Sequence, residues 1–227
     1  MKLLPAFCVF GAVLCTSGAH AASAPGDAWS YRVINAYNGE VRGTVRVRVE
    51  KSDADRVALA VTPDQPALGT ARTDVYTARG LGVRQPLINH DMPVEYEFAE
   101  PYPAYDFPLD AGKSWSTRVN ATIPASGRKA SVRVDGSVLG TERITVPAGV
   151  FDTVKIGRRI YAGDFEGGRS ETNIVETEWY APSLGRAVKL DRSSSYMDQQ
   201  RCSDEMSPCR PVRGDWFVYE LVDAGAR

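Results

Sequence analysis

The chain has 227 residues, with 27 lysines and arginines against 28 aspartates and glutamates, which gives a formal net charge of −1 at pH 7. The basic residues are scattered rather than clustered, so the charge pattern does not favour nucleic acid or an anionic membrane surface as a partner. A chain of this length, with 43% hydrophobic residues, can build a core of its own.

The first 21 residues are typical of a secretory signal peptide. Lys2 is followed by an apolar stretch over 3–15 that is too short to span a bilayer, and Ala19-His20-Ala21 is a small-x-small cleavage site. We expect cleavage between Ala21 and Ala22, export to a bacterial periplasm or beyond, and no transmembrane segment after cleavage. We further expect a disordered leader over 22–28 and a single β domain over 29–227.

The first predicted strand, around Tyr31 and Val33, ends at Asn38-Gly39, a strong hairpin signal because both residues tolerate positive φ. The return strand places Val41, Val45, Val47 and Val49 on one face, which the alternation assigns to the core. A turn over 51–55 precedes a strand beginning with Val57, Leu59 and Val61, and a loop over 62–74 precedes a strand over 73–79.

Residues 82–112 form the least regular part of the sequence, because five prolines interrupt it. We expect a long loop or edge segment packed across a sheet. Its five aromatic side chains are the predicted cover of an apolar ligand site, and they are Tyr96, Phe98, Tyr102, Tyr105 and Phe107.

Regular alternation returns after this segment, with glycine and proline between the predicted strands. These strands span 114–122, 130–138, 142–146, 151–161, 170–180, 186–192 and 215–221. No stretch has the helical period with a convincing cap. The expected fold class is therefore all-β, either a single curved antiparallel sheet (a half-barrel) or a β-sandwich of about ten strands.

Three strings in the second half of the chain occur in a familiar order. They are Phe107-Pro108-Leu109 followed by Gly112-Lys113-Ser114-Trp115, then Val146-Pro147-Ala148-Gly149-Val150-Phe151-Asp152, then Trp179-Tyr180-Ala181-Pro182-Ser183-Leu184-Gly185. This series resembles a group of secreted bacterial β-sheet proteins that carry a domain of unknown function. The resemblance implies an envelope location and a curved sheet like that of lipoprotein carriers, and it implies no catalytic residues.

Two cysteines remain after signal cleavage, Cys202 and Cys209, and six residues separate them. In an exported chain such a pair predicts one disulfide, a local staple rather than a C-x-x-C redox site.

Candidate catalytic patterns are sparse. His90 and Asp91 are adjacent in a proline-bracketed loop and are interpreted as a solvated turn. Ser126-Gly127-Arg128-Lys129 fits an S-x-x-K pattern but lacks the helix and the companion motifs of that chemistry. Glu176 and Glu178 lie two apart on one predicted strand and are interpreted as a charged solvent face, with Val175, Thr177 and Trp179 as core.

The sequence therefore predicts no catalytic residue, no metal ligand and no cofactor. The favoured function is a non-enzymatic envelope protein that binds an apolar ligand such as a lipid, or another envelope protein, on a curved β-sheet. The alternatives are a structural or carbohydrate-recognising surface module, and a hydrolase of unrecognised type.

Overall fold

The computed structural model describes residues 24–88, 94–166, 168–199 and 211–225. They form thirteen strands and one short 3₁₀ turn, and every strand pairing is antiparallel. No helix within these ranges is long and apolar enough to cross a membrane. The elements are β1 (Ala28–Asn35), β2 (Val41–Ser52), β3 (Arg56–Pro63), η1 (Pro66–Leu68), β4 (Arg72–Thr77), β5 (Gly82–Ile88), β6 (Val94–Tyr102), β7 (Ser114–Ile123), β8 (Arg128–Val146), β9 (Gly149–Tyr161), β10 (Phe165–Glu166), β11 (Arg169–Ala181), β12 (Arg186–Asp198) and β13 (Pro211–Asp223).

The sheet closes on itself. Consecutive strands pair from β1 to β9, β9 pairs with β11, and β11, β12 and β13 lead back to β1, so that every strand except β10 belongs to one ring of twelve. The all-β antiparallel prediction is confirmed, but the half-barrel and the ten-strand sandwich are wrong. The last strand pairs with the first from Ser30–Asp223 to Asn35–Phe217, and this pairing removes the free edges that a half-barrel would leave.

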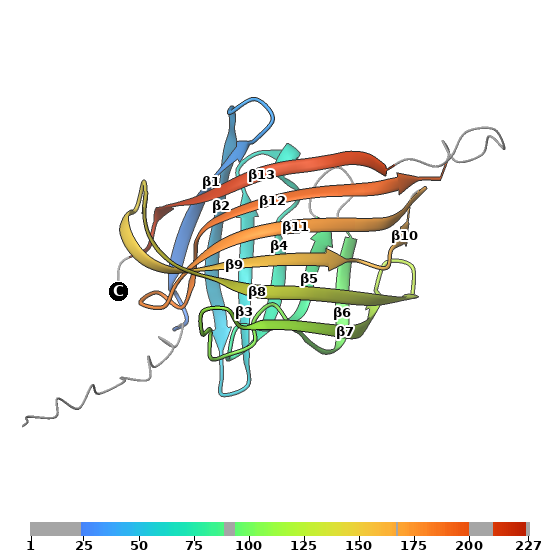
Figure 1. Ribbon diagram of the computed structural model, residues 1–227, viewed down its shortest axis with the longest axis horizontal. Helices are drawn as coiled ribbons and strands as arrows, with labels where there is room; N and C mark the ends of the chain where they lie inside the picture. The colour runs from blue at the N-terminus through green and yellow to red at the C-terminus, as the bar shows by residue number, and fades with distance from the viewer. Residues whose placement is uncertain (1–23, 89–93, 167, 200–210, 226–227) are drawn as a thin grey trace, which may run out of the picture.

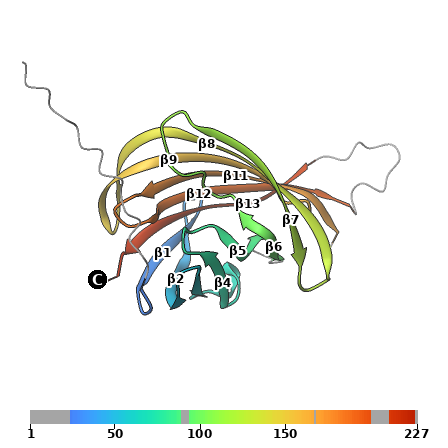
Figure 2. The same ribbon diagram turned by 90° about the horizontal axis from the view of Figure 1, so that it is seen from below.

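The ring is made of two unlike layers. Figure 1 shows the long strands β8, β9, β11, β12 and β13 crossing the front of the molecule, with the shorter strands β1–β6 running steeply behind them. From below, the long strands arch over the short ones (Figure 2). A twelve-strand barrel is wider than the roughly eight-strand barrels that side chains just fill, so the interior must be occupied by large residues, by loops or by solvent.

Several predicted boundaries change in the structure. The predicted strands 130–138 and 142–146 are one 19-residue strand, β8, whose register shifts between Val138 and Gly140. The segment 82–112 contains two strands, β5 and β6, where a loop was expected. The β5–β6 register is irregular around Pro86, so this proline falls where the ladder is already interrupted.

The start of the described chain is hydrogen-bonded to the sheet. Gly26 N–H donates to the carbonyl of Val49 at 2.9 Å, and Val49 N–H donates to the carbonyl of Asp27 at 2.8 Å. Residues 24–28, which were expected to belong to a disordered leader, therefore extend the contact with β2.

The valine face of β2 points into the barrel as predicted. Val47 and Val49 are buried and Val45 packs against the same cluster, while the alternate arginines face outward. Val41 is the exception, since it is exposed at the start of the strand.

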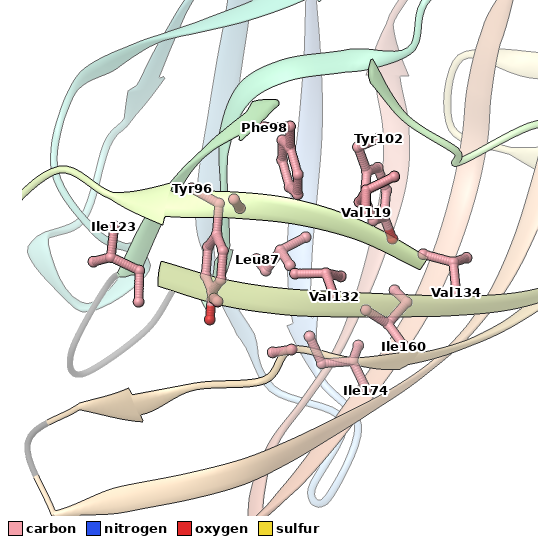
Figure 3. Packing of buried hydrophobic residues seen from close by; sticks show 13 residues of the cluster. Leu87, Tyr96, Phe98, Tyr102, Val119, Ile123, Val132, Val134, Ile160 and Ile174 are labelled. Carbon is pink, nitrogen blue, oxygen red and sulfur yellow. The ribbon is translucent and has the colours of Figure 1, made fainter. Parts of the chain in front are cut away.

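The barrel interior holds two apolar clusters. The first is formed by β5–β9 and β11 (Figure 3), and its members are Leu87, Tyr96, Phe98, Tyr102, Val119, Ala121, Ile123, Ala130, Val132, Val134, Ile160, Ala162 and Ile174. The second lies around Trp29, Val188 and Leu221, on strands β1–β3, β8 and β11–β13. Along β11, Ile174 belongs to the first cluster and Ala181 to the second, so the residues between them lie where the two clusters meet.

Candidate functional site

The inner face of β11 carries two carboxylates between the apolar clusters. Glu176 and Glu178 are 6% and 3% exposed, whereas Val175 on the other face is 46% exposed. The interpretation of these glutamates as a solvent face is therefore wrong, and so is the assignment of Val175 to the core. Burying two ionised carboxylates requires nearby cations, and the neighbouring strands supply them.

Arg158 on β9 holds both glutamates. The register places it directly opposite Glu176. Its Nε donates to Glu176 Oε2 at 2.8 Å, its Nη2 donates to Glu178 Oε2, and its Nη1 donates to the carbonyl of Ala104 at 3.1 Å. Burial alone would lower the pKa of the Arg158 guanidinium, but the charges of Glu178 and Glu176 outweigh that effect and raise it.

Arg192 on β12 approaches Glu176 from the other side. Its Nη1 donates to Glu176 Oε1 at 2.9 Å, and its Nη2 donates to the carbonyl of Leu87 on β5. Burial opposes ionisation of Glu176, yet Arg158 and Arg192 together outweigh burial and lower its pKa. Four charged side chains from three adjacent strands therefore form one ion-pair network across the interior.

The segment between β6 and β7 is tied to this network. The Tyr105 hydroxyl donates to Glu178 Oε1 at 2.6 Å, and the Tyr105 ring packs against Phe107 and Tyr180 with centroids 5.3 Å away in each case. Burial and the Glu178 charge raise the pKa of Tyr105 well above its ordinary value. The Trp115 indole adds an anchor by donating to the carbonyl of Pro103 at 3.1 Å.

The five aromatic residues predicted as ligand cover divide into two sets. Tyr96, Phe98 and Tyr102 are on β6 and belong to the first apolar cluster. Tyr105 and Phe107 lie in the irregular segment after β6 and pack on Tyr180 of β11.

A cavity of about 250 Å³ lies beside the ion-pair network. Arg158, Glu176, Glu178 and Arg192 form part of its wall, together with residues of β4, β5, β6 and β12. The β4 residues in the wall are Arg72, Asp74 and Tyr76. They lie opposite apolar residues of β3, so their side chains point to the same inner face as those residues, which are Val61, Leu59 and Val57. A larger, more open hollow of about 450 Å³ lies between the turns at Asp55 and Arg79, and exposed turn residues line much of it.

Arg72 and Asp74 form a fourth ion pair in the cavity wall, separate from the network of Arg158, Glu176, Glu178 and Arg192. Arg72 Nε donates to Asp74 Oδ1 at 3.0 Å. Asp74 is only 4% exposed, and its burial raises the pKa of its carboxyl despite the opposing charge of Arg72.

Several polar groups of the wall have no hydrogen-bond partner within the described part of the chain. They are the two terminal nitrogens of Arg72, the second carboxylate oxygen of Asp74, the hydroxyls of Tyr76 and Tyr102, and the amide of Gln85. Gly82 leaves room for that amide, since a Cβ at Gly82 would come within 2.7 Å of Gln85 Nε2. None of these atoms is both fully buried and unpaired, so each retains some contact with solvent and is available to a molecule inside the cavity.

The other sequence candidates are not brought to this site. Ala21, Ala22, His90, Cys202 and Cys209 lie outside the described residues. The Ser126–Lys129 segment spans the exposed turn between β7 and β8. No group of three or more His, Cys, Asp or Glu side chains among the described residues could hold a metal ion.

Sequence reasoning missed the arginines of the interior, although one signal was present. Arg158 has the same parity as Ile156 and Ile160, both of which are fully buried, so the alternation of β9 already placed this arginine on the inner face. An inward arginine requires an inward carboxylate, and the paired glutamates of β11 were the available partners.

No protein-family profile matches the chain, and no curated protein is significantly similar to it. Among solved structures, it is similar to a protein from Parabacteroides distasonis inferred to be a lipoprotein, with 13% identity, a TM-score of 0.46, and coverage of 88% of this chain and 95% of that one. It is also similar to the hypothetical lipoprotein YmcC from Escherichia coli (10% identity, TM-score 0.40, coverage 86% and 83%). A protein from Bacteroides fragilis, inferred to be exported and described as having a YmcC-like fold, gives 15% identity, a TM-score of 0.45, and coverage of 88% and 95%. Similarity at this level assigns neither an activity nor a ligand.

Proposed function

We propose that the protein is an exported binding protein that holds a small polar ligand in the interior of its barrel. The observation that supports this most is the convergence of unpaired polar groups from Arg72, Asp74, Tyr76, Gln85 and Tyr102 on one cavity. A few well-placed polar groups in a concave, largely preformed site are the usual composition of a small-molecule site. Export is proposed on the signal-peptide pattern of residues 1–21.

The composition of the cavity wall favours a polar ligand over the apolar ligand predicted from the sequence. The apolar parts of the interior are filled by the two side-chain clusters. The cavity wall has apolar residues as well, but it also contains six charged side chains and the hydroxyls of three tyrosines, Tyr76, Tyr102 and Tyr105. An acyl chain placed there would leave four ion pairs without hydration. The exposed aromatics Tyr37 and Trp216 meet edge to face at 88° rather than as a flat row, so they give little support to a surface carbohydrate platform.

The ion-pair network favours binding over acid–base hydrolysis. Glu176 accepts from two arginines and its pKa is lowered, which makes it a poor proton donor at neutral pH. Glu178 is occupied by Arg158 and Tyr105. We therefore propose that these carboxylates shape the cavity and do not carry out chemistry.

Thermal unfolding of the mature protein in the presence of hexoses, amino acids, organic acids and inorganic phosphate tests this proposal. A ligand that binds the folded state raises the Tm in a concentration-dependent way. We expect one polar class to do so, and we expect Tyr76→Phe and Gln85→Ala to weaken the response. Tyr37→Phe is the matched control, because its hydroxyl lies on the outside and donates to the carbonyl of Gly214.

A parallel titration with a fluorescent fatty acid distinguishes the two ligand types. Saturable fatty-acid binding without any response to polar compounds would show that the interior takes an apolar ligand after all. A polar response that is unchanged in Tyr76→Phe and Gln85→Ala would place the site elsewhere on the molecule.

A further inference from the structure

The charges around the cavity balance. Its wall contains three guanidinium groups, Arg72, Arg158 and Arg192, and three carboxylates, Asp74, Glu176 and Glu178. Every one of these groups forms a salt bridge with another member of the set. The cavity therefore offers a ligand no net charge, although it is strongly polar.

This balance disfavours an ionic ligand. A molecule with a net charge would bring one uncompensated charge into the cavity, and burying an uncompensated charge is costly. A zwitterion would compete with a pair that is already made, since Arg72 and Asp74 bind each other at 3.0 Å. A neutral molecule can hydrogen-bond to the free edges of that pair without separating it.

The unpaired groups match hydroxyls. The terminal nitrogens of Arg72 only donate, the free oxygen of Asp74 only accepts, and Gln85 and the two tyrosine hydroxyls do both. A hydroxyl group donates and accepts, so a ligand rich in hydroxyls can satisfy all of these groups. The cavity of about 250 Å³ equals about eight water molecules at roughly 30 Å³ each, which limits the ligand to a small molecule.

We infer that the cavity takes a neutral polyhydroxylated molecule of about the size of one sugar ring. This inference rests on the proposed function, because it names the chemical class of the ligand at the same site. Among ligands of similar shape, it predicts that net charge determines which one binds most tightly.

Isothermal titration with matched sugars tests the inference. Glucose, galactose and mannose are each compared with the corresponding uronate and 2-amino sugar, which keep the ring and change the charge. We expect at least one neutral sugar to bind about tenfold more tightly than both of its charged counterparts. Tighter binding of a charged counterpart, or no saturable binding by any neutral sugar, would overturn the inference.

A variant with one fewer negative charge tests whether the balanced charge of the wall causes the preference for a neutral sugar. Asp74→Asn gives the wall one excess positive charge while keeping the shape, so the affinity for the uronate relative to the neutral sugar should rise about tenfold. The double variant Arg72→Gln/Asp74→Asn restores the balance and should restore the preference. Asp135→Asn is the control: Asp135 accepts from Arg133 with the same spacing and the same 3.0 Å distance, but on the outward face of β8.

The outcomes separate this inference from the proposed function. If neutral and charged sugars bind equally, or if amino acids or phosphate bind better, the proposed function stands and the charge argument fails. If only a fatty acid binds, both fail. Circular dichroism checks the fold of each variant, and if Asp74→Asn does not fold, the comparison of matched sugars on the wild-type protein still decides.

Discussion

Removal of Arg158 is the most informative perturbation of the interior. In Arg158→Met the aliphatic volume is largely kept, while Glu178 retains only the Tyr105 hydroxyl and Glu176 retains only Arg192. Removing one partner of a buried ion pair typically costs about 3–5 kcal/mol, because the remaining charge is left uncompensated. For a domain of this size that loss corresponds to a decrease in Tm of roughly 6–20 °C, at roughly 2–4 °C per kcal/mol.

Urea unfolding followed by tryptophan fluorescence measures this cost. Arg159→Met is the matched control, since Arg159 is the next residue on β9 and is exposed. We expect the control to change the free energy of unfolding by no more than about 0.5 kcal/mol. The double variant Arg158→Met/Glu178→Gln removes the orphaned charge as well, so it should recover about 2 kcal/mol relative to Arg158→Met alone. Equal losses in the Arg158 and Arg159 variants would refute the reasoning.

The same network predicts how stability depends on pH. The pKa of Glu176 is lower in the folded state than in the unfolded state, so its contribution is complete above the unfolded pKa and is lost as pH falls through the folded pKa. Asp74 acts in the opposite direction, because its raised pKa makes the folded state gain stability as pH falls toward the unfolded value of 3.8. Arg158→Met weakens the Glu176 effect, so its free energy of unfolding should fall less steeply on acidification than that of the wild type. A steeper fall in the variant would contradict this assignment.

Three further predictions concern other parts of the chain. Gly136→Ala should cost about 1–3 kcal/mol in urea unfolding, because a Cβ at this position would lie 2.2 Å from the Trp115 ring and would displace it; an unchanged midpoint would contradict that packing. Intact mass before and after reduction and alkylation should show Cys202 joined to Cys209, and two free thiols in protein from an oxidising compartment would exclude the disulfide. N-terminal sequencing of protein from the envelope fraction should begin at Ala22, and an unprocessed N-terminus would argue against export by this signal.

The local sequence pattern was sufficient to predict a strand and its buried face where one face is apolar and the other is charged. In β2, Val47 and Val49 point inward and the arginines point outward, as alternation requires. The hairpin before it is also local, since Gly39 has a φ of 74° and follows Asn38. In such segments the hydrophobic effect and the turn chemistry act on neighbouring residues, so the sequence alone determined strand type, face and turn.

Period-two alternation separates two faces of a strand but does not say which one is inside. In β11 the choice is between the face of Val175 and the face of Glu176 with Glu178. The sequence favoured the apolar face for the core, which is wrong for the exposed Val175, whereas Trp179 is half-buried and packs against the second cluster. The carboxylates are inside because Arg158 and Arg192 lie on the adjoining strands in register with them. That compensation depends on which strands pair, and the alternation of β11 does not contain this information.

Closure of the sheet was likewise decided only by the tertiary structure. The prediction of antiparallel strands is confirmed, but about ten were expected where the described chain has thirteen, and the pairing of β1 with β13 closes the sheet that was expected to be open. The sequence determined an all-β chain with alternating strands, since these features depend on residues close together along the chain. The closed ring, the buried ion pairs and the polar cavity depend on residues that are far apart in the sequence, and they exist only once the register between distant strands is set.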